Sequence, residues 1–161
     1  MSDATRTYSA DQLWLADGWS ADGAFAVDAS GHVAPPEGEA ERLGAWVLPG
    51  MPNLHSHAFQ RAMAGLAERK GRSDDSFWTW RETMYAFAAA IGPHELKAIA
   101  AQLYVEMLKA GYTQVCEFHY VQHQPDGTPY AERHAMIEAL VEAAAEVGIG
   151  LTVLPVMYER A

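Results

Sequence analysis

The stretch that decides the fold is Leu48-Pro49-Gly50-Met51-Pro52-Asn53-Leu54-His55-Ser56-His57. It reads as an extended run that prolines make irregular and that ends in two histidines separated by one residue. On a strand, side chains at positions i and i+2 point to the same face, so His55 and His57 would present two imidazoles side by side. Two converging imidazoles are what a zinc-like metal ion binds. The alternative is a pair of loop histidines that face solvent.

Downstream of this stretch, strand and helix patterns alternate. Strands are expected over 46–57, 113–118 and 151–156, and helices over 93–111 and 131–147. Pro93 suits a helix start, where its missing N–H is not needed, and Gly148 suits a helix stop. Strand, helix, strand, helix, strand is typical of a parallel sheet with right-handed crossovers. Both a doubly wound sheet and a (β/α)8 barrel begin in this way. Active sites in both collect at the strand ends, where the histidine pair would lie.

Residues 1–45 have a different pattern. Short apolar runs are broken by turn residues such as Asp17-Gly18 and Ser30-Gly31, which predicts a meander of hairpins. Strands of this length bury little on their own, so this part is expected to pack on something else. We therefore divide the chain into part of a small β-sandwich-like domain, residues 1–45, and an α/β part, residues 46–161.

The composition excludes several classes of protein. The 161 residues include 11 Lys and Arg against 21 Asp and Glu, a formal net charge of −10. This acidic balance argues against a nucleic-acid or membrane-surface partner. A single cysteine, Cys116, excludes a disulfide framework. No apolar run approaches the ~18 residues of a membrane span, and the first residues lack the apolar core of a signal peptide, so a cytoplasmic location is expected.

The stretch from Leu48 to His57 resembles the first-strand motif of the amidohydrolase superfamily. Its continuation at 58–66 and the segments 78–82 and 117–120 are similar to the superfamily's family of N-formimidoyl-L-glutamate deiminases. The resemblance covers essentially the whole chain. It implies an α/β fold, a metal-dependent (β/α)8 TIM barrel beside a small N-terminal β domain. It also implies zinc-dependent hydrolysis of N-formimidoyl-L-glutamate to N-formyl-L-glutamate and ammonia, a step of histidine degradation. Fe²⁺ or another divalent ion is the alternative metal.

The resemblance also implies roles for individual residues. By position, His55 and His57 match two metal ligands, and Gln60, Arg81 and Tyr120 match residues that hold the substrate. A guanidinium can bind a carboxylate of a dicarboxylate substrate with two parallel hydrogen bonds. Each of the three substrate residues also has a structural alternative. Arg81 could cover nearby tryptophans, Gln60 could simply begin a helix, and Tyr120 could cover a loop.

A full barrel takes ~250 residues, so only about three of its eight strands are expected here. The remaining ligands and the acid–base histidine would then lie beyond residue 161. No catalytic residue is expected within this chain, and the chain alone is expected to be inactive.

Other interpretations stay open. The chain could belong to a superfamily enzyme that acts on flat heterocycles, such as a guanine deaminase or a chlorohydrolase, or be a truncated chain without catalytic activity. The expected partner is a small dicarboxylate, and a homodimer is left open. Glu117, His119 and His123 suggest a second metal cluster, since the first two are again at i and i+2. The resemblance puts no ligand there, and histidines near a barrel mouth often orient their neighbours instead.

Overall fold

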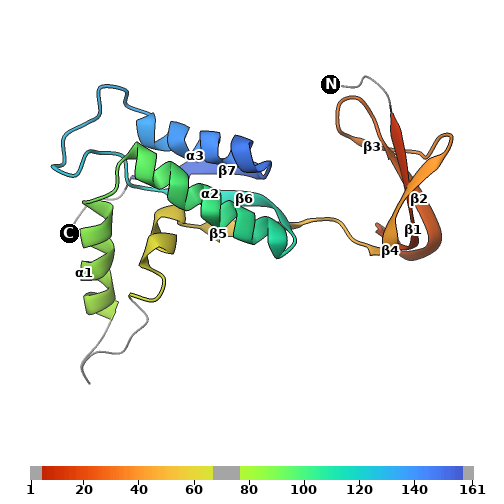
Figure 1. Cartoon of the computed structure of the whole chain (residues 1–161), viewed down its shortest axis with the longest axis horizontal. Helices are drawn as coiled ribbons and strands as arrows, with labels where there is room; N and C mark the ends of the chain where they lie inside the picture. The colour runs from red at the N-terminus through yellow and green to blue at the C-terminus, as the bar shows by residue number, and fades with distance from the viewer. Residues whose placement is uncertain (1–4, 67–76, 158–161) are drawn as a thin grey trace. The chain divides into compact units, whose positions relative to one another are not determined.

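The computed structural model describes residues 5–66 and 77–157 of the chain (Figure 1). The chain divides into two compact units, Met1–Pro49 and Gly50–Ala161. The extended run expected over 46–57 belongs to two strands, because Trp46 and Val47 complete the last strand of the first unit and the first strand of the second unit begins at Met51.

The N-terminal unit is a four-stranded sheet with the strand order β3-β2-β1-β4. Its strands are β1 (Arg6–Leu15), β2 (Gly18–Val27), β3 (Val33–Ala34) and β4 (Ala40–Val47). β1, β2 and β3 form the expected antiparallel hairpins, and the turn into β2 uses Gly18 at a φ of 110°. The prediction of a meander is wrong at β4, which pairs parallel with β1. The connection from Val27 to Ala40 is long enough to return the chain to the far edge of the sheet.

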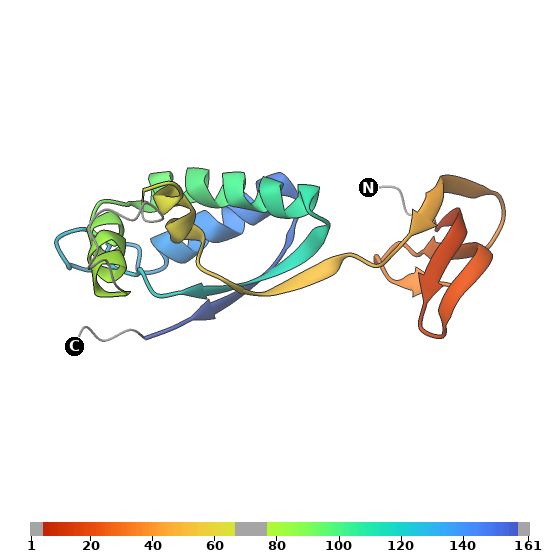
Figure 2. The same ribbon diagram turned by 90° about the horizontal axis from the view of Figure 1, so that it is seen from below.

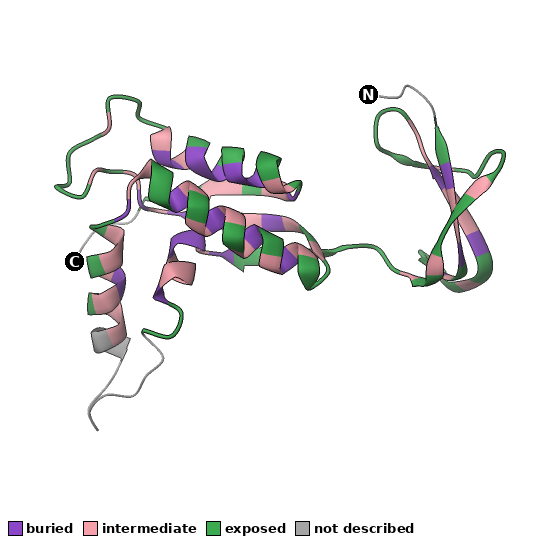
Figure 3. Cartoon of the chain, viewed as in Figure 1, coloured by how far each residue is buried: buried purple, intermediate pink, exposed green. Residues whose placement is uncertain are grey.

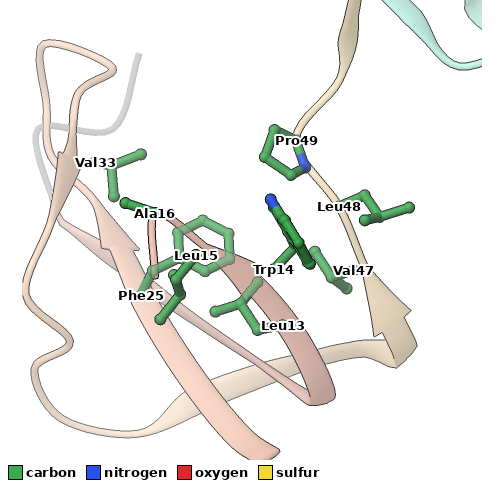
Figure 4. A pocket seen from close by; sticks show the side chains of 9 residues that line it. All are labelled: Leu13, Trp14, Leu15, Ala16, Phe25, Val33, Val47, Leu48 and Pro49. Carbon is green, nitrogen blue, oxygen red and sulfur yellow. The ribbon is translucent and has the colours of Figure 1, made fainter. Parts of the chain in front are cut away.

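Large apolar side chains of this unit remain exposed. Trp19 contacts Trp14 and Trp46 edge to face, with ring centroids 5.2 and 5.0 Å away, and Trp46 is 67% exposed. Apolar side chains that include Trp14 and Phe25 also line a pocket of about 380 Å³ (Figure 4). The sheet therefore has a small core of its own and an apolar surface that no described residue of the same unit covers.

The second unit is a parallel α/β layer structure. Its strands are β5 (Met51–Ser56), β6 (Tyr112–His119) and β7 (Gly150–Pro155), and its helices are η1 (Ala58–Met63), α1 (Phe77–Ala88), α2 (Pro93–Lys109) and α3 (Ala135–Val147). The sheet order is β5-β6-β7, and both pairs are parallel. α2 and α3 lie on the same face of this sheet (Figure 2). The expected α/β organisation with a small N-terminal β region is therefore confirmed.

The core lies between the sheet and its two helices (Figure 3). α2 buries Leu96, Ala100 and Tyr104, which recur every four residues and so share one helix face. Leu140 of α3 is 0% exposed within the same core. α3 begins at Ala135, later than its apolar pattern predicted, and ends at Gly148, which has a φ of 84°. Within residues 5–66 and 77–157, no helix has the length and apolar character of a membrane span.

Candidate active site

The histidine pair lies at the carboxyl end of β5, on the face of the sheet opposite the helices. Ser56, between the two histidines, is buried and pairs in register with Glu117 of β6. Because side chains alternate along a strand, His55 and His57 point to the other face. Their Nε2 atoms are 3.0 Å apart, and their rings are nearly perpendicular. The two imidazoles therefore converge through one nitrogen each.

The neighbouring strand β6 orients both rings. Nδ1 of His57 lies 2.8 Å from the backbone oxygen of Phe118. A carbonyl can only accept a hydrogen bond, so in the neutral imidazole Nδ1 carries the proton and Nε2 presents its lone pair. The Phe118 ring stacks on His55 with a centroid distance of 4.6 Å and an interplanar angle of 30°. One residue of β6 thus contacts both histidines and fixes the tautomer of one.

The geometry of this pair fits part of a zinc site. Two nitrogens that each lie about 2.05 Å from a tetrahedral zinc ion are about 3.3 Å apart, close to the spacing of the His55 and His57 Nε2 atoms. Within the described parts of the chain, no group of three or more His, Cys, Asp and Glu residues converges on one point. The described residues therefore offer two candidate ligands, fewer than the four that a tetrahedral ion needs.

A pocket of about 340 Å³ adjoins the histidine pair. Segments that are distant in sequence line it: His57, Gln60, Trp80, Arg81, Met84, Phe118, Tyr120 and Val156. Four of the five residues that the sequence singled out are among these, and the fifth, His55, adjoins them through His57. The fold thus brings all five together.

Hydrogen bonds join several of these side chains. Nε2 of Gln60 donates to the hydroxyl of Tyr120 over 3.0 Å, and this hydroxyl lies 3.5 Å from Sδ of Met84. The Tyr120 ring also contacts His57, with centroids 5.2 Å apart. Met84 and Trp80 were not identified from the sequence. Spacing on α1 offers a signal for Met84, since it lies three residues after Arg81 and so on nearly the same helix face.

Arg81 is oriented from within its own helix. Its Nε donates to the hydroxyl of Tyr85, one turn further along α1, over 2.8 Å. The guanidinium carbon lies 5.2 Å from the centroid of the Tyr85 ring, a cation–π distance. Trp80 lines the same pocket, whereas the side chain of Trp78 lies outside the described residues. The arginine is therefore held beside the pocket by a tyrosine.

Glu117 and His119 lie on the helix-covered face, away from the histidine pair. They are 1% and 2% exposed. Burial raises the pKa of the Glu117 carboxyl, while hydrogen bonds from the Ala58 N–H and the Ser56 hydroxyl act in the opposite direction. Burial lowers the pKa of His119 to about 4, so this imidazole is neutral at pH 7. His123 lies apart from them, in a bridge with Pro129.

Comparisons with known proteins identify the family to which this fold belongs. The model of the amidohydrolase family matches residues 46–161. Formimidoylglutamate deiminase from Pseudomonas aeruginosa is 54% identical over 157 residues, which cover 94% of this chain and 35% of that protein. The crystal structure of an amidohydrolase from Brucella melitensis has a TM-score of 0.84 at 47% identity, over 93% of this chain and 34% of that one.

A zinc complex of atrazine chlorohydrolase from Arthrobacter aurescens shares the fold, with a TM-score of 0.69 at 21% identity over 92% of this chain and 35% of that one. The chain thus spans about a third of the length of the relatives that it matches.

Proposed function

The chain belongs to the amidohydrolase family, and from that premise we propose that it forms the first part of the active site of a zinc-dependent formimidoylglutamate deiminase. The observation that carries this proposal is the pocket in which His57, Gln60, Arg81 and Tyr120 meet beside His55. The identity of 54% to a deiminase of that name supports the choice of substrate.

The proposed fold is a (β/α)8 barrel to which this chain contributes the first three strands. Two features support a barrel over a doubly wound sheet. The strands follow one another in chain order, and α2 and α3 cover one face only. A doubly wound sheet would carry helices on both faces. The uncovered face would then be the inside of the barrel, with the histidine pair at its carboxyl-terminal mouth.

His55 and His57 would hold the metal through their Nε2 atoms, with the remaining ligands supplied by later strands. A zinc ion bound there supplies a Lewis acid and a bound water with a pKa near neutrality. The hydrogen bond from Nδ1 of His57 to Phe118 keeps that imidazole in the tautomer that can bind a cation. The acid–base group is expected outside this chain.

The pocket residues would bind the glutamyl part of the substrate. The Arg81 guanidinium, oriented by Tyr85, would pair with a carboxylate. Gln60 and Tyr120, already hydrogen-bonded to each other, would position a second polar group. Trp80, whose ring lines the pocket, would contact the methylene groups and exclude water. Hydrolysis would replace the terminal nitrogen of the formimidoyl group by oxygen and release ammonia. The proposal includes a role in histidine degradation and a cytoplasmic location.

The proposal is tested by measuring ammonia release from N-formimidoyl-L-glutamate by the full-length protein, with and without removal of metal by a chelator. We expect turnover that is lost on chelation and restored by zinc. Guanine and a chlorinated triazine serve as comparison substrates. Turnover of either heterocycle with none of formimidoylglutamate would favour the alternative enzymes of this family and contradict the proposal. The 161-residue chain alone is expected to release no ammonia.

A further inference from the structure

A buried carboxylate lies directly behind the histidine pair. Glu117 is 1% exposed, on the helix-covered face of β6, and one of its oxygens, Oε2, has no hydrogen-bond partner. A buried carboxylate is costly unless hydrogen bonds compensate it. Tyr104 of α2, which packs over this part of the sheet, is also buried. Its burial, together with the charge of Glu117, raises the pKa of its phenol. The core therefore keeps an acidic residue at a position where an apolar residue would pack at lower cost.

The hydrogen bond that Glu117 accepts comes from the segment that carries His57. Its Oε1 accepts a hydrogen bond from the backbone N–H of Ala58, the residue after His57. Its register partner, Ser56, is the residue before His57 and is buried on the same face of the sheet. Glu117 therefore bonds the backbone just after His57 and lies beside the residue just before it.

The backbone needs such a support at this point. The pairing of β5 with β6 changes register between Asn53 and Ser56, so the regular strand ladder is interrupted where the histidines lie. Ala58 begins η1, and the first N–H groups of a helix have no partner within it. Glu117 supplies an acceptor for the N–H of Ala58 and so fixes the direction in which the chain leaves His57.

We propose that Glu117 is a positioning residue for the metal site, acting through the backbone N–H of Ala58 and its pairing beside Ser56 to aim the His57 imidazole. The next residue, Phe118, completes the same support, since its carbonyl accepts from His57 and its ring stacks on His55. Two successive residues of β6 thus hold the histidine pair from opposite faces of the sheet. The inference rests on the proposed function, because it requires a metal at His55 and His57.

The test separates positioning from a general contribution to stability. In the full-length protein, Glu117→Leu removes both acceptor oxygens at similar volume, and Glu117→Gln keeps one. Leu140→Ala is the matched control, since Leu140 is fully buried on α3 in the same helix layer. The dissociation constant for zinc is measured by chelator competition, and the visible absorption spectrum is recorded after cobalt substitution. Both are measured at a temperature at which every variant is folded.

We expect Glu117→Leu to weaken zinc binding by about 10–100-fold and to change the cobalt spectrum, as the loss of residues that orient metal ligands does elsewhere. Glu117→Gln should recover most of the affinity. Leu140→Ala should melt at a lower temperature with an unchanged dissociation constant and spectrum. Wild-type affinity and spectrum in Glu117→Leu would overturn the inference. An equal loss of affinity in Leu140→Ala would overturn it as well.

A second variant keeps the test decisive if Glu117→Leu does not fold. Glu117→Asp keeps the carboxylate but withdraws it by one methylene from the Ala58 N–H, so it should weaken zinc binding several-fold, and an unchanged affinity in it would contradict the inference. The wild-type protein separates this inference from the proposed function. If the wild type binds zinc and hydrolyses formimidoylglutamate while the variants match it, only the role of Glu117 fails. If the wild type binds no zinc, both proposals fail.

Discussion

The two faces of the β5-β6-β7 sheet carry different kinds of residue, although the same strands supply both. On the helix-covered face, Val115 and Glu117 are buried against α2 and α3. On the other face, His55, His57 and Phe118 lie beside the pocket. Apart from Glu117, whose hydrogen bond reaches the segment of His57, alternate residues of these strands therefore serve stability on one face and the candidate site on the other. Substitutions on the two faces should have separable effects, and the predictions below test that separation.

The largest effect is expected for the histidine pair. His57→Ala and His55→Ala should lose most of their bound zinc, with affinity falling by more than the ~100-fold that loss of an orienting residue can cost. The free energy of unfolding of the metal-free protein should change little, because these side chains lie on the uncovered face. Metal analysis of the purified variants measures the first effect and urea unfolding the second.

His94→Ala is the control for both histidine variants, since the His94 side chain is 94% exposed and lies at the start of α2. It should keep full zinc. Stoichiometric zinc in His57→Ala would remove that residue from the proposed set of ligands.

The next effect belongs to the covered face. Leu140→Ala should lower the free energy of unfolding by about 2–5 kcal/mol, because it leaves a cavity in a fully packed core. Zinc content and kcat/KM per folded molecule should stay near those of the wild type. Urea unfolding and metal analysis check the two parts. A large loss of zinc in this variant would mean that the two faces are coupled and would break the comparison.

A smaller effect is expected at Arg81, beside the pocket. Arg81→Met should reduce kcat/KM for formimidoylglutamate by roughly one to two decades, the equivalent of a charge-assisted hydrogen bond worth ~1.5–3 kcal/mol. Arg81→Lys should recover activity only in part, because an ammonium lacks the planar pair of donors. Zinc content should not change in either.

Arg42→Met is the control for Arg81, since Arg42 pairs with Asp11 in the N-terminal unit. Kinetics and melting temperature are measured together. Normal kinetics with a lowered melting temperature in the Arg81 variants would indicate that Arg81 supports the helix rather than the substrate.

The smallest effect lies on the outer side of the helix layer. Hydrogen bonds from Arg61, then from Gln102, lower the pKa of Glu106 to about 2, from an ordinary value of 4.5. A lowered folded-state pKa stabilises above pH 4.5, and the contribution is lost as the pH falls towards 2. Glu106→Gln should therefore be slightly less stable than the wild type at pH 7 and equal to it near pH 2. Urea unfolding at both pH values tests this, and a difference independent of pH would contradict the assignment.

Local patterns in the sequence were sufficient for part of this picture. Pro93 and Gly148 mark a helix start and a helix end because their backbone preferences are intrinsic. The convergence of His55 and His57 follows from the two-residue period of a strand. The same period applies to Glu117 and His119, yet those residues lie on the opposite face. The face depends on the register between β5 and β6, which no local pattern contains.

The pocket residues that the sequence did not identify depend on tertiary packing. Trp80 and Met84 reach the pocket only because α1 lies beside the end of the sheet. The spacing from Arg81 indicates only that Met84 shares its helix face, and no local pattern indicates where α1 packs. The substrate-binding role of Arg81 was predicted from resemblance to a family and not from local pattern. An arginine after aromatic residues is otherwise typical of a helix surface. The parallel pairing of β4 was missed for a similar reason, because the length of a connection permits more than one strand order.

That parallel pair has a consequence for the timing of synthesis. β1 meets β2 across a two-residue turn, and such a hairpin closes in about 1–10 μs. Its other neighbour, β4, is not available until Val47 has been translated, 32 residues after Leu15. At ~5–20 residues per second, this interval is about 2–6 s. For that time one edge of β1 is unpaired on the nascent chain and open to pairing with other strands. Translation rate through the segment from β2 to β4 should therefore influence the yield of folded protein.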